Sequence, residues 1–137
     1  PSYVSMESAL RYYGLIPESV YTIQSMTTKH TREFKNTLGK FEFTQCPKAY
    51  FSIGIKQETK DNTAFLIASP EKALCDLILH TPNLNLRFQK NILTYLEENL
   101  RFDMDAFYQM DGRIFEQCAL VGKKKATLKN ILKIIKQ

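Results

Sequence analysis

The stretch Ser69-Pro70-Glu71-Lys72-Ala73-Leu74-Cys75-Asp76-Leu77-Ile78-Leu79 decides the fold, because the sequence changes there from strand patterns to helix patterns. Ser69 is a favourable N-cap residue, and a proline directly after it suits the first turn of a helix. Glu71 places a carboxylate where the helix dipole favours negative charge. We predict a helix that starts at Pro70 and ends before Thr81-Pro82, with Ser69, Pro70 and Glu71 in structural roles.

Asp76 interrupts the apolar part of this stretch, and the periodicity leaves its burial open. A buried carboxylate has to be hydrogen-bonded or paired, and a basic residue from the sheet could be its partner. Proton-transfer chemistry would need a second acid or base beside Asp76. We interpret Asp76 as a structural anchor and not as a catalytic group.

Upstream of this stretch, the sequence predicts one helix followed by strands. Ser5 can cap a helix over residues 5–13. Polar and aromatic residues then alternate in short runs between turn residues, which is typical of an antiparallel sheet with one buried face. The predicted strands are residues 20–26, the hairpin arms 32–35 and 40–44, residues 50–56 and residues 64–68, with a polar turn over 57–62.

Downstream, apolar residues recur at helical spacing. The predicted helices cover about 86–100, with Phe88 on the apolar face, then the segment from an Asp103 cap to Met110, the segment after Asp111-Gly112, and about 124–136. Strands dominate the first half of the chain and helices the second, which favours an α+β fold. We expect a single domain over residues 1–137: an antiparallel sheet of about four to five strands, packed with the N-terminal helix, and a helical C-terminal half.

Composition points to a protein with an ordinary core in a reducing compartment. The 137 residues are 44% hydrophobic, without an apolar run long enough to span a membrane and without a signal peptide. Cys46, Cys75 and Cys118 lie far apart, unlike the even cysteine frameworks of secreted domains. We expect buried or half-buried thiols in a cytoplasmic protein, and a zinc site that includes His30 or His80 is the less favoured alternative.

The basic charge is concentrated at the C-terminal end. The formal net charge is +5, yet residues 121–137 hold six lysines and no acid, and the other 120 residues hold 13 basic and 14 acidic side chains. An apolar stripe at helical spacing runs through the same segment, and the lysines lie mostly away from it. The stripe is Leu128, Ile131, Leu132 and Ile135; the lysines are Lys123, Lys124, Lys125, Lys129, Lys133 and Lys136.

Two interpretations of this segment stay open. It can contact the phosphates of a nucleic acid or an acidic protein surface, or it can be the solvated face of a helix that packs on the core. The absence of any acid favours binding. Arg32 and Lys35, in a second basic set around the first hairpin, are further binding candidates, although solvated charges that protect a sheet edge explain them as well.

Motifs for catalysis are sparse. The five glycines never cluster into a phosphate-binding loop, and neither GxSxG nor HExxH occurs. Glu58, Lys60 and Asp61 match a fragment of a magnesium-dependent nuclease, but they fall in a predicted polar turn. We expect no catalytic residue and no cofactor, and a nuclease-like enzyme is the least favoured alternative.

Four stretches follow one another in a specific order. Residues 1–17 form a tyrosine-serine start that leads into a helix ending in Tyr13-Gly14-Leu15. Residues 20–32 form a strand with a threonine-rich end, and Gly39-Lys40-Phe41-Glu42-Phe43 forms a hairpin arm. Residues 68–78 carry Ser-Pro-Glu followed by Ala-Leu and Asp-Leu. Together they resemble the C-terminal domain of AbiEi-type antitoxins, over about residues 1–80 and only in pattern beyond.

The resemblance implies a bacterial toxin–antitoxin system that serves phage defence or the maintenance of mobile elements. Such proteins join an N-terminal winged helix-turn-helix, which represses its own operon, to an antitoxin domain whose partner is a nucleotidyltransferase-like toxin. No winged helix precedes Tyr3, so we expect the C-terminal domain of a longer protein or a protein that lost its DNA-binding half. The alternative is a stand-alone nucleic-acid-binding module that uses the basic C-terminal helix, with non-specific phosphate contacts. The oligomeric state stays open.

Overall fold

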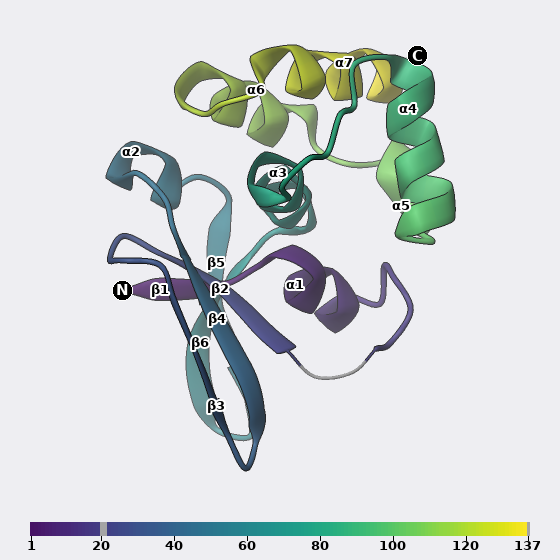
Figure 1. Cartoon of the computed structure of the whole chain (residues 1–137). Coiled ribbons are helices and arrows are strands. Elements are labelled where there is room, and N and C mark those ends of the chain that lie inside the picture. The colour runs from purple at the N-terminus through teal and green to yellow at the C-terminus, as the bar shows by residue number, and fades with distance from the viewer. Residues whose placement is uncertain (20–21, 137) are drawn as a thin grey trace.

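A buried helix, α3 (Pro70–His80), lies at the centre of the computed structural model, which describes residues 1–19 and 22–136. Every residue from Lys72 to Ile78 is buried. The backbone N–H of Lys72 donates to the Ser69 hydroxyl, so the predicted N-cap and helix start are confirmed. Figure 1 shows α3 in the middle of the molecule, where it contacts α1 (Met6–Tyr12) on one side and α6 (Gly112–Val121) on another.

The sheet is mixed and has six strands among the described residues, in the order β3-β4-β2-β1-β6-β5. The strands are β1 (Ser2–Val4), β2 (Thr22–Thr27), β3 (Arg32–Asn36), β4 (Gly39–Gln45), β5 (Ile55–Lys60) and β6 (Thr63–Ala68). β1 pairs parallel with β6, and β2 pairs parallel with β4. The α+β class is confirmed. The sheet has six strands where four to five were expected, and two of its five pairings are parallel where an antiparallel sheet was expected.

Two features of the chain explain this difference. β1 has only three residues, too few to show an alternating pattern, and it becomes a strand because β2 and β6 flank it. The β3–β4 hairpin folds back so that β4, and not β3, lies beside β2. Both pairings depend on residues that are distant in sequence, and local alternation carries no information about them.

Residues 48–62 differ most from the sequence prediction. The expected strand over 50–56 is instead the short helix α2 (Lys48–Phe51), after which Gly54 reverses the chain at a φ of +61°. The expected polar turn over 57–62 is mostly strand β5, and only Asp61 and Asn62 form the turn, at φ values of 53° and 64°. Two successive left-handed residues suit a tight β-hairpin. The polar sequence of β5 reflects its place at the edge of the sheet.

The other predicted elements of the first half agree with the structure. α1 lies within the predicted helix over residues 5–13, and β3 and β4 form the predicted hairpin. β6 lies between β1 and β5, as its apolar sequence suggested for an interior strand. β2 corresponds to the strand predicted over 20–26, of which Val20 and Tyr21 lie outside the described residues.

The second half is helical, as predicted. Its elements are α3, α4 (Gln89–Thr94), a π-helical turn η1 (Tyr95–Asn99), α5 (Met104–Tyr108), α6 and α7 (Lys125–Ile135). Asp103 and Asp111 cap α5 and α6 through their side chains. Phe88 was predicted to lie on an apolar helix face, but it precedes α4 and is 61% exposed. None of the helices in the described ranges has the length and apolar character needed to cross a membrane.

Candidate functional site

Asp76 is the centre of a closed polar cluster inside the molecule. Three hydroxyl groups donate to its carboxylate. They belong to Tyr3 of β1, at 2.8 Å, to Ser5, which directly precedes α1, and to Tyr50 of α2. All four side chains are buried, and Asp76 is 0% exposed. The carboxylate therefore ties the first strand and α2 to the central helix.

Lys72 lies one helical turn before Asp76 and is equally buried. Its ammonium group donates to the backbone carbonyls of Tyr50 at 2.7 Å and Phe51 at 3.2 Å, and also to that of Ile53. The same nitrogen lies 4.3 Å from the centre of the Tyr50 ring. Lys72 thus holds the carbonyls at the C-terminal end of α2, of which the Tyr50 carbonyl also accepts the backbone N–H of Ile53 at 3.2 Å.

The prediction that a basic residue from the sheet pairs with Asp76 was wrong. The partners are hydroxyl groups, and the cation that attracts Asp76 through space is Lys72 on the same helix. Burial raises the pKa of the Asp76 carboxyl, and Lys72 and the three hydroxyls oppose that rise. Burial lowers the pKa of Lys72, and the charge of Asp76 opposes that fall.

This cluster offers no surface to a substrate. Lys72 is 0% exposed, Tyr3 1% and Tyr50 2%, so neither solvent nor a ligand reaches the polar atoms. Burial and the Asp76 charge raise the pKa values of both tyrosines, which keeps their hydroxyls protonated as donors. The geometry agrees with a structural anchor, the role assigned to Asp76 from sequence.

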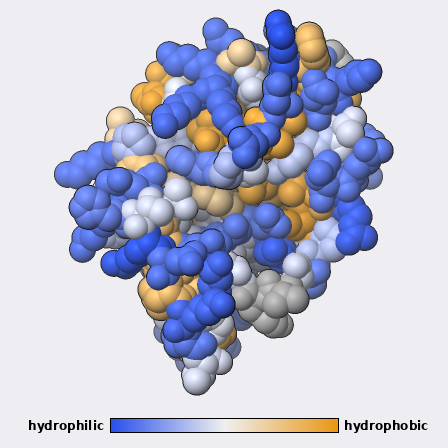
Figure 2. Space-filling model, viewed as in Figure 1, coloured by the Kyte–Doolittle hydropathy of each residue, from blue (hydrophilic) through white to orange (hydrophobic). Residues whose placement is uncertain are grey.

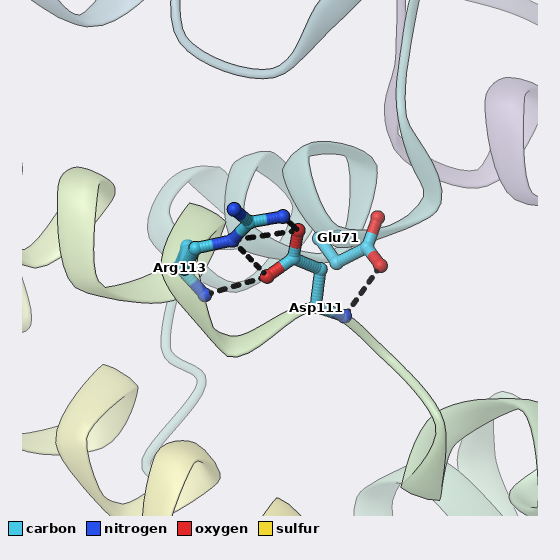
Figure 3. A network of polar contacts seen from close by, with 3 residues as sticks. All are labelled: Glu71, Asp111 and Arg113. Carbon is cyan, nitrogen blue, oxygen red and sulfur yellow. Dashed lines mark hydrogen bonds and ion pairs between the residues drawn. The ribbon is translucent and has the colours of Figure 1, made fainter.

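The first turn of α3 makes a second structural connection. Glu71 reaches across to the start of α6, where its carboxylate accepts the backbone N–H of Asp111 at 2.8 Å (Figure 3). Asp111 in turn accepts the backbone N–H of Arg113 as the cap of α6, and its carboxylate binds the Arg113 guanidinium at 2.8 Å. These contacts lower the pKa of the Asp111 carboxyl. Glu71 therefore does more than interact with its own helix dipole, because it also positions α6.

The basic segment folds as α7, with its apolar face in the core. Leu128, Ile131, Leu132 and Ile134 are buried, and Ile135 is half-buried, so the apolar face is one residue wider than the predicted stripe. Lys123, Lys125, Lys129, Lys133 and Lys136 are exposed. Lys125, Lys129 and Lys133 follow one another at every fourth position, which aligns them on one helix face.

The six lysines are not equivalent. Lys124 is half-buried with a φ of 54°, and its ammonium donates to the carbonyl of Ile78 at 2.8 Å. Lys136 forms an ion pair with Glu116 at 3.3 Å. Lys123, Lys125, Lys129 and Lys133 form no ion pair with any described residue. We call these four exposed residues the lysine surface; Lys124 lies beneath it in a structural contact.

Basic residues from outside the C-terminal segment lie near α7. The side chain of Asn130 donates to the carbonyl of Arg87, which places the start of α4 against α7. Arg87 and Lys90 are exposed, and the exposed Phe88 ring lies 5.4 Å from the Arg87 guanidinium. The sequence prediction missed these residues, because it placed Phe88 inside a helix and had no means to bring residues 87–90 beside α7.

Arg32 and Lys35, the other predicted binding residues, do not join this surface. They lie on β3, at the opposite end of the molecule from α7 (Figure 1). The Arg32 guanidinium lies 4.6 Å above the Phe43 ring. The predicted binding set therefore divides into two separate basic regions.

Of the residues named for the nuclease alternative, Glu58 and Lys60 lie on β5 and Asp61 lies in the turn after it. Glu58 forms an ion pair with Lys56 at 3.3 Å and accepts the Tyr12 hydroxyl, and it lies on β5 and not in the predicted turn. Cys46, Cys75 and Cys118 are all buried free thiols. Within residues 1–19 and 22–136, no three histidine, cysteine or acidic side chains gather into a metal-binding group.

A shallow hollow of about 170 Å³ lies beside Tyr50, between Leu79, His80, Gly122 and Lys123. Drug-sized ligands usually occupy pockets of about 300–1,000 Å³. Burial and the neighbouring Lys123 and Lys124 lower the pKa of His80, which favours its neutral form. The hollow gives no ground for assigning a cofactor.

The chain was compared with known proteins. No family model matches its sequence, and no curated protein matches it either.

Proposed function

We propose that this chain is the antitoxin and regulator domain of a bacterial abortive-infection system, and that it acts by binding. The similarity to AbiEi-type antitoxins rests on stretches that are far apart in sequence. Tyr3 and Ser5 from the first of these stretches bind Asp76 from the last. This contact in the core supports the view that the similar stretches form one folded unit. Because these residues are buried, a partner has to bind the exposed surface.

The lysine surface is the observation that carries the proposal. Its four lysines are exposed, lack acidic partners among the described residues, and lie on a segment without a single acid. Such a surface creates a positive potential that attracts and orients an anionic partner. An acidic face of a nucleotidyltransferase-like toxin meets this requirement.

Growth rescue tests the proposal. The nucleotidyltransferase-like protein encoded beside this chain would be expressed alone and together with the chain, and we expect co-expression to restore growth. The triple variant Lys125→Gln, Lys129→Gln, Lys133→Gln should lose the rescue. The charge-matched triple variant Lys29→Gln, Lys48→Gln, Lys60→Gln, with all three lysines exposed elsewhere, should keep it. A neighbouring gene of another kind, or a toxin that the chain does not neutralise, would overturn the proposal.

A stand-alone nucleic-acid-binding module is the second candidate, and the further basic residues near α7 favour it. Arg87 and Lys90 are exposed basic side chains at the start of α4, and they would add phosphate contacts. Affinity for duplex DNA should then fall steeply with salt, and the Lys125/Lys129/Lys133 variant should reduce the log–log slope by up to about 2.7. Fluorescence anisotropy with a labelled duplex measures both quantities. Equal slopes for this variant and the charge-matched variant would exclude the module.

A further inference from the structure

The free edge of the sheet is a feature that the proposed function does not use. β3 forms this edge, and all five of its residues are exposed. The β3–β4 hairpin extends away from the helices (Figure 1), and Leu38 in its turn is 82% exposed. The unpaired N–H and C=O groups of an edge strand can bond to another strand.

The register of the hairpin determines which backbone groups face outward. Asn36 and Gly39 flank a two-residue turn and are partners in the β3–β4 register. In such a hairpin the pair next to the turn exchanges hydrogen bonds, and every second pair along the strands does the same. Phe34 therefore bonds inward to β4, and the N–H and C=O groups of Glu33 and Lys35 point to the free edge.

The two faces of the hairpin differ in character. On one face Phe34, 46% exposed, stacks on Phe41 at 5.2 Å and Phe43 at 5.9 Å. Figure 2 shows hydrophobic residues reaching the surface in the region of the hairpin and β6. On the other face lie Glu33 and Lys35, and the Glu33 side chain remains 63% exposed although it pairs with Lys40. An incoming strand has to match an aromatic face and a charged face together.

We propose that β3 pairs antiparallel with β3 of a second copy of this chain, about a two-fold axis at Phe34. In this register Glu33 lies opposite Lys35 of the second copy, and Lys35 lies opposite its Glu33. The residues with outward backbone groups are then opposite one another, which is what antiparallel hydrogen bonding requires. The two Phe34 rings meet on the aromatic face. This single register provides the backbone hydrogen bonds, the opposite-charge pairs and the apolar contact together.

Other arrangements lack this match. A two-fold axis at Glu33 or at Lys35 would place identical charges directly opposite each other, which is unfavourable. At the other edge of the sheet, Lys56 and Glu58 of β5 already pair with each other. They also contact the C-terminal end of α1 and its cap: Lys56 lies 5.1 Å from the Tyr13 ring, and Glu58 accepts the Tyr12 hydroxyl at 3.1 Å. On β3 Glu33 also pairs with Lys40, but Lys35 forms no ion pair with any described residue, so the β3 edge keeps a positive charge free for a second copy.

The pairing leaves the lysine surface free in both copies, because α7 lies at the other end of the molecule from β3 (Figure 1). A single strand pair is smaller than the interfaces of stable dimers, so we expect a dissociation constant between about 10 µM and 1 mM. Binding of a partner at α7 and pairing at β3 are independent, and loss of either leaves the other intact.

Sedimentation velocity of charge variants tests this proposal. Glu33→Lys and Lys35→Glu each create two like-charge pairs, and each variant alone should dimerise at least about tenfold more weakly than the natural chain. An equimolar mixture of the two variants should associate, because the heterodimer restores both opposite-charge pairs. The double variant should also dimerise. Lys60→Glu on β5 and Glu98→Lys on η1 are the controls and should dimerise as the natural chain does.

The location is checked by amide NMR shifts that depend on concentration, which we expect at Glu33, Phe34 and Lys35. A natural chain that stays monomeric up to about 1 mM would overturn the proposal. So would a mixture of the two single variants that fails to associate, or shifts confined to other elements. None of these results bears on toxin neutralisation, which is measured separately.

Discussion

Replacement of Asp76 is the most direct test of the buried anchor. Asp76→Ala removes the acceptor of the hydroxyls of Tyr3, Ser5 and Tyr50 while leaving these donors buried. It also removes the charge that attracts Lys72. Asp76→Asn keeps the size and one acceptor oxygen but removes the negative charge.

The magnitude follows from the number of groups left without partners. A hydrogen bond to a charged group contributes about 1.5–3 kcal/mol, and such contributions are not fully additive within one cluster. Removing one member of a buried charged group costs about 3–5 kcal/mol, so we expect Asp76→Ala to lower the free energy of unfolding by about 4 kcal/mol. Asp76→Asn should cost about 2 kcal/mol. The exposed Asp105→Ala is the control and should cost less than about 1 kcal/mol.

Urea denaturation followed by circular dichroism measures these changes, with an unchanged m-value as evidence that the variants still unfold in two states. If Asp76→Ala costs less than about 1 kcal/mol, the interpretation of Asp76 as a structural anchor is refuted.

The pH dependence of stability is a second test of Asp76. Burial raises the pKa of Asp76 in the folded state, so the folded chain binds this proton more tightly than the unfolded chain. The stability that Asp76 contributes is then complete below its unfolded pKa and declines as pH rises through the folded pKa. A difference between the natural chain and Asp76→Asn that grows with pH would show that Lys72 and the hydroxyls outweigh burial.

Two further predictions concern single groups. Ser69→Ala should lower the free energy of unfolding by about 1 kcal/mol through loss of the α3 cap, and Ser69→Thr should recover most of that loss in the same urea assay. Equal stability of the natural chain and both variants would show that the Ser69 cap does not stabilise the fold. Burial raises the pKa of Tyr13 to about 12, and those of Tyr3 and Tyr50 further, so the folded chain keeps protons that the unfolded chain loses. This stability is present below pH 10 and declines as pH rises through the folded values, and absorbance at 295 nm should show Tyr3 and Tyr50 ionising only together with unfolding.

The helices were predictable because their signals are local. Ser69, Pro70, Asp103 and Asp111 mark helix starts through contacts within three residues, and the structure confirms each start. The apolar stripe of α7 was predictable for the same reason, since the residues that share a helix face are three and four positions apart. Exposure of five of the six lysines followed from that stripe. The half-burial of Lys124 did not, because its partner, the Ile78 carbonyl, belongs to α3.

The errors have the opposite cause. Residues 50–56 alternate like a strand, but the buried contact between Tyr50 and Asp76 and the carbonyls that Lys72 binds stabilise a helical turn and a reversal instead. Arg87 and Lys90 lie near α7 only because α4 packs beside it.

The sequence by itself determined the α+β class, the order of the helices other than α2, the hairpin and the acid-free lysine segment, because periodicity and capping act between near neighbours. Only the tertiary structure decided that β1 lies between β2 and β6, that β4 pairs parallel with β2, and that three hydroxyls from outside α3 meet at Asp76. These contacts join residues up to 73 positions apart. Such contacts form because burying apolar surface and pairing buried polar groups are properties of the whole chain, and a local pattern does not contain them.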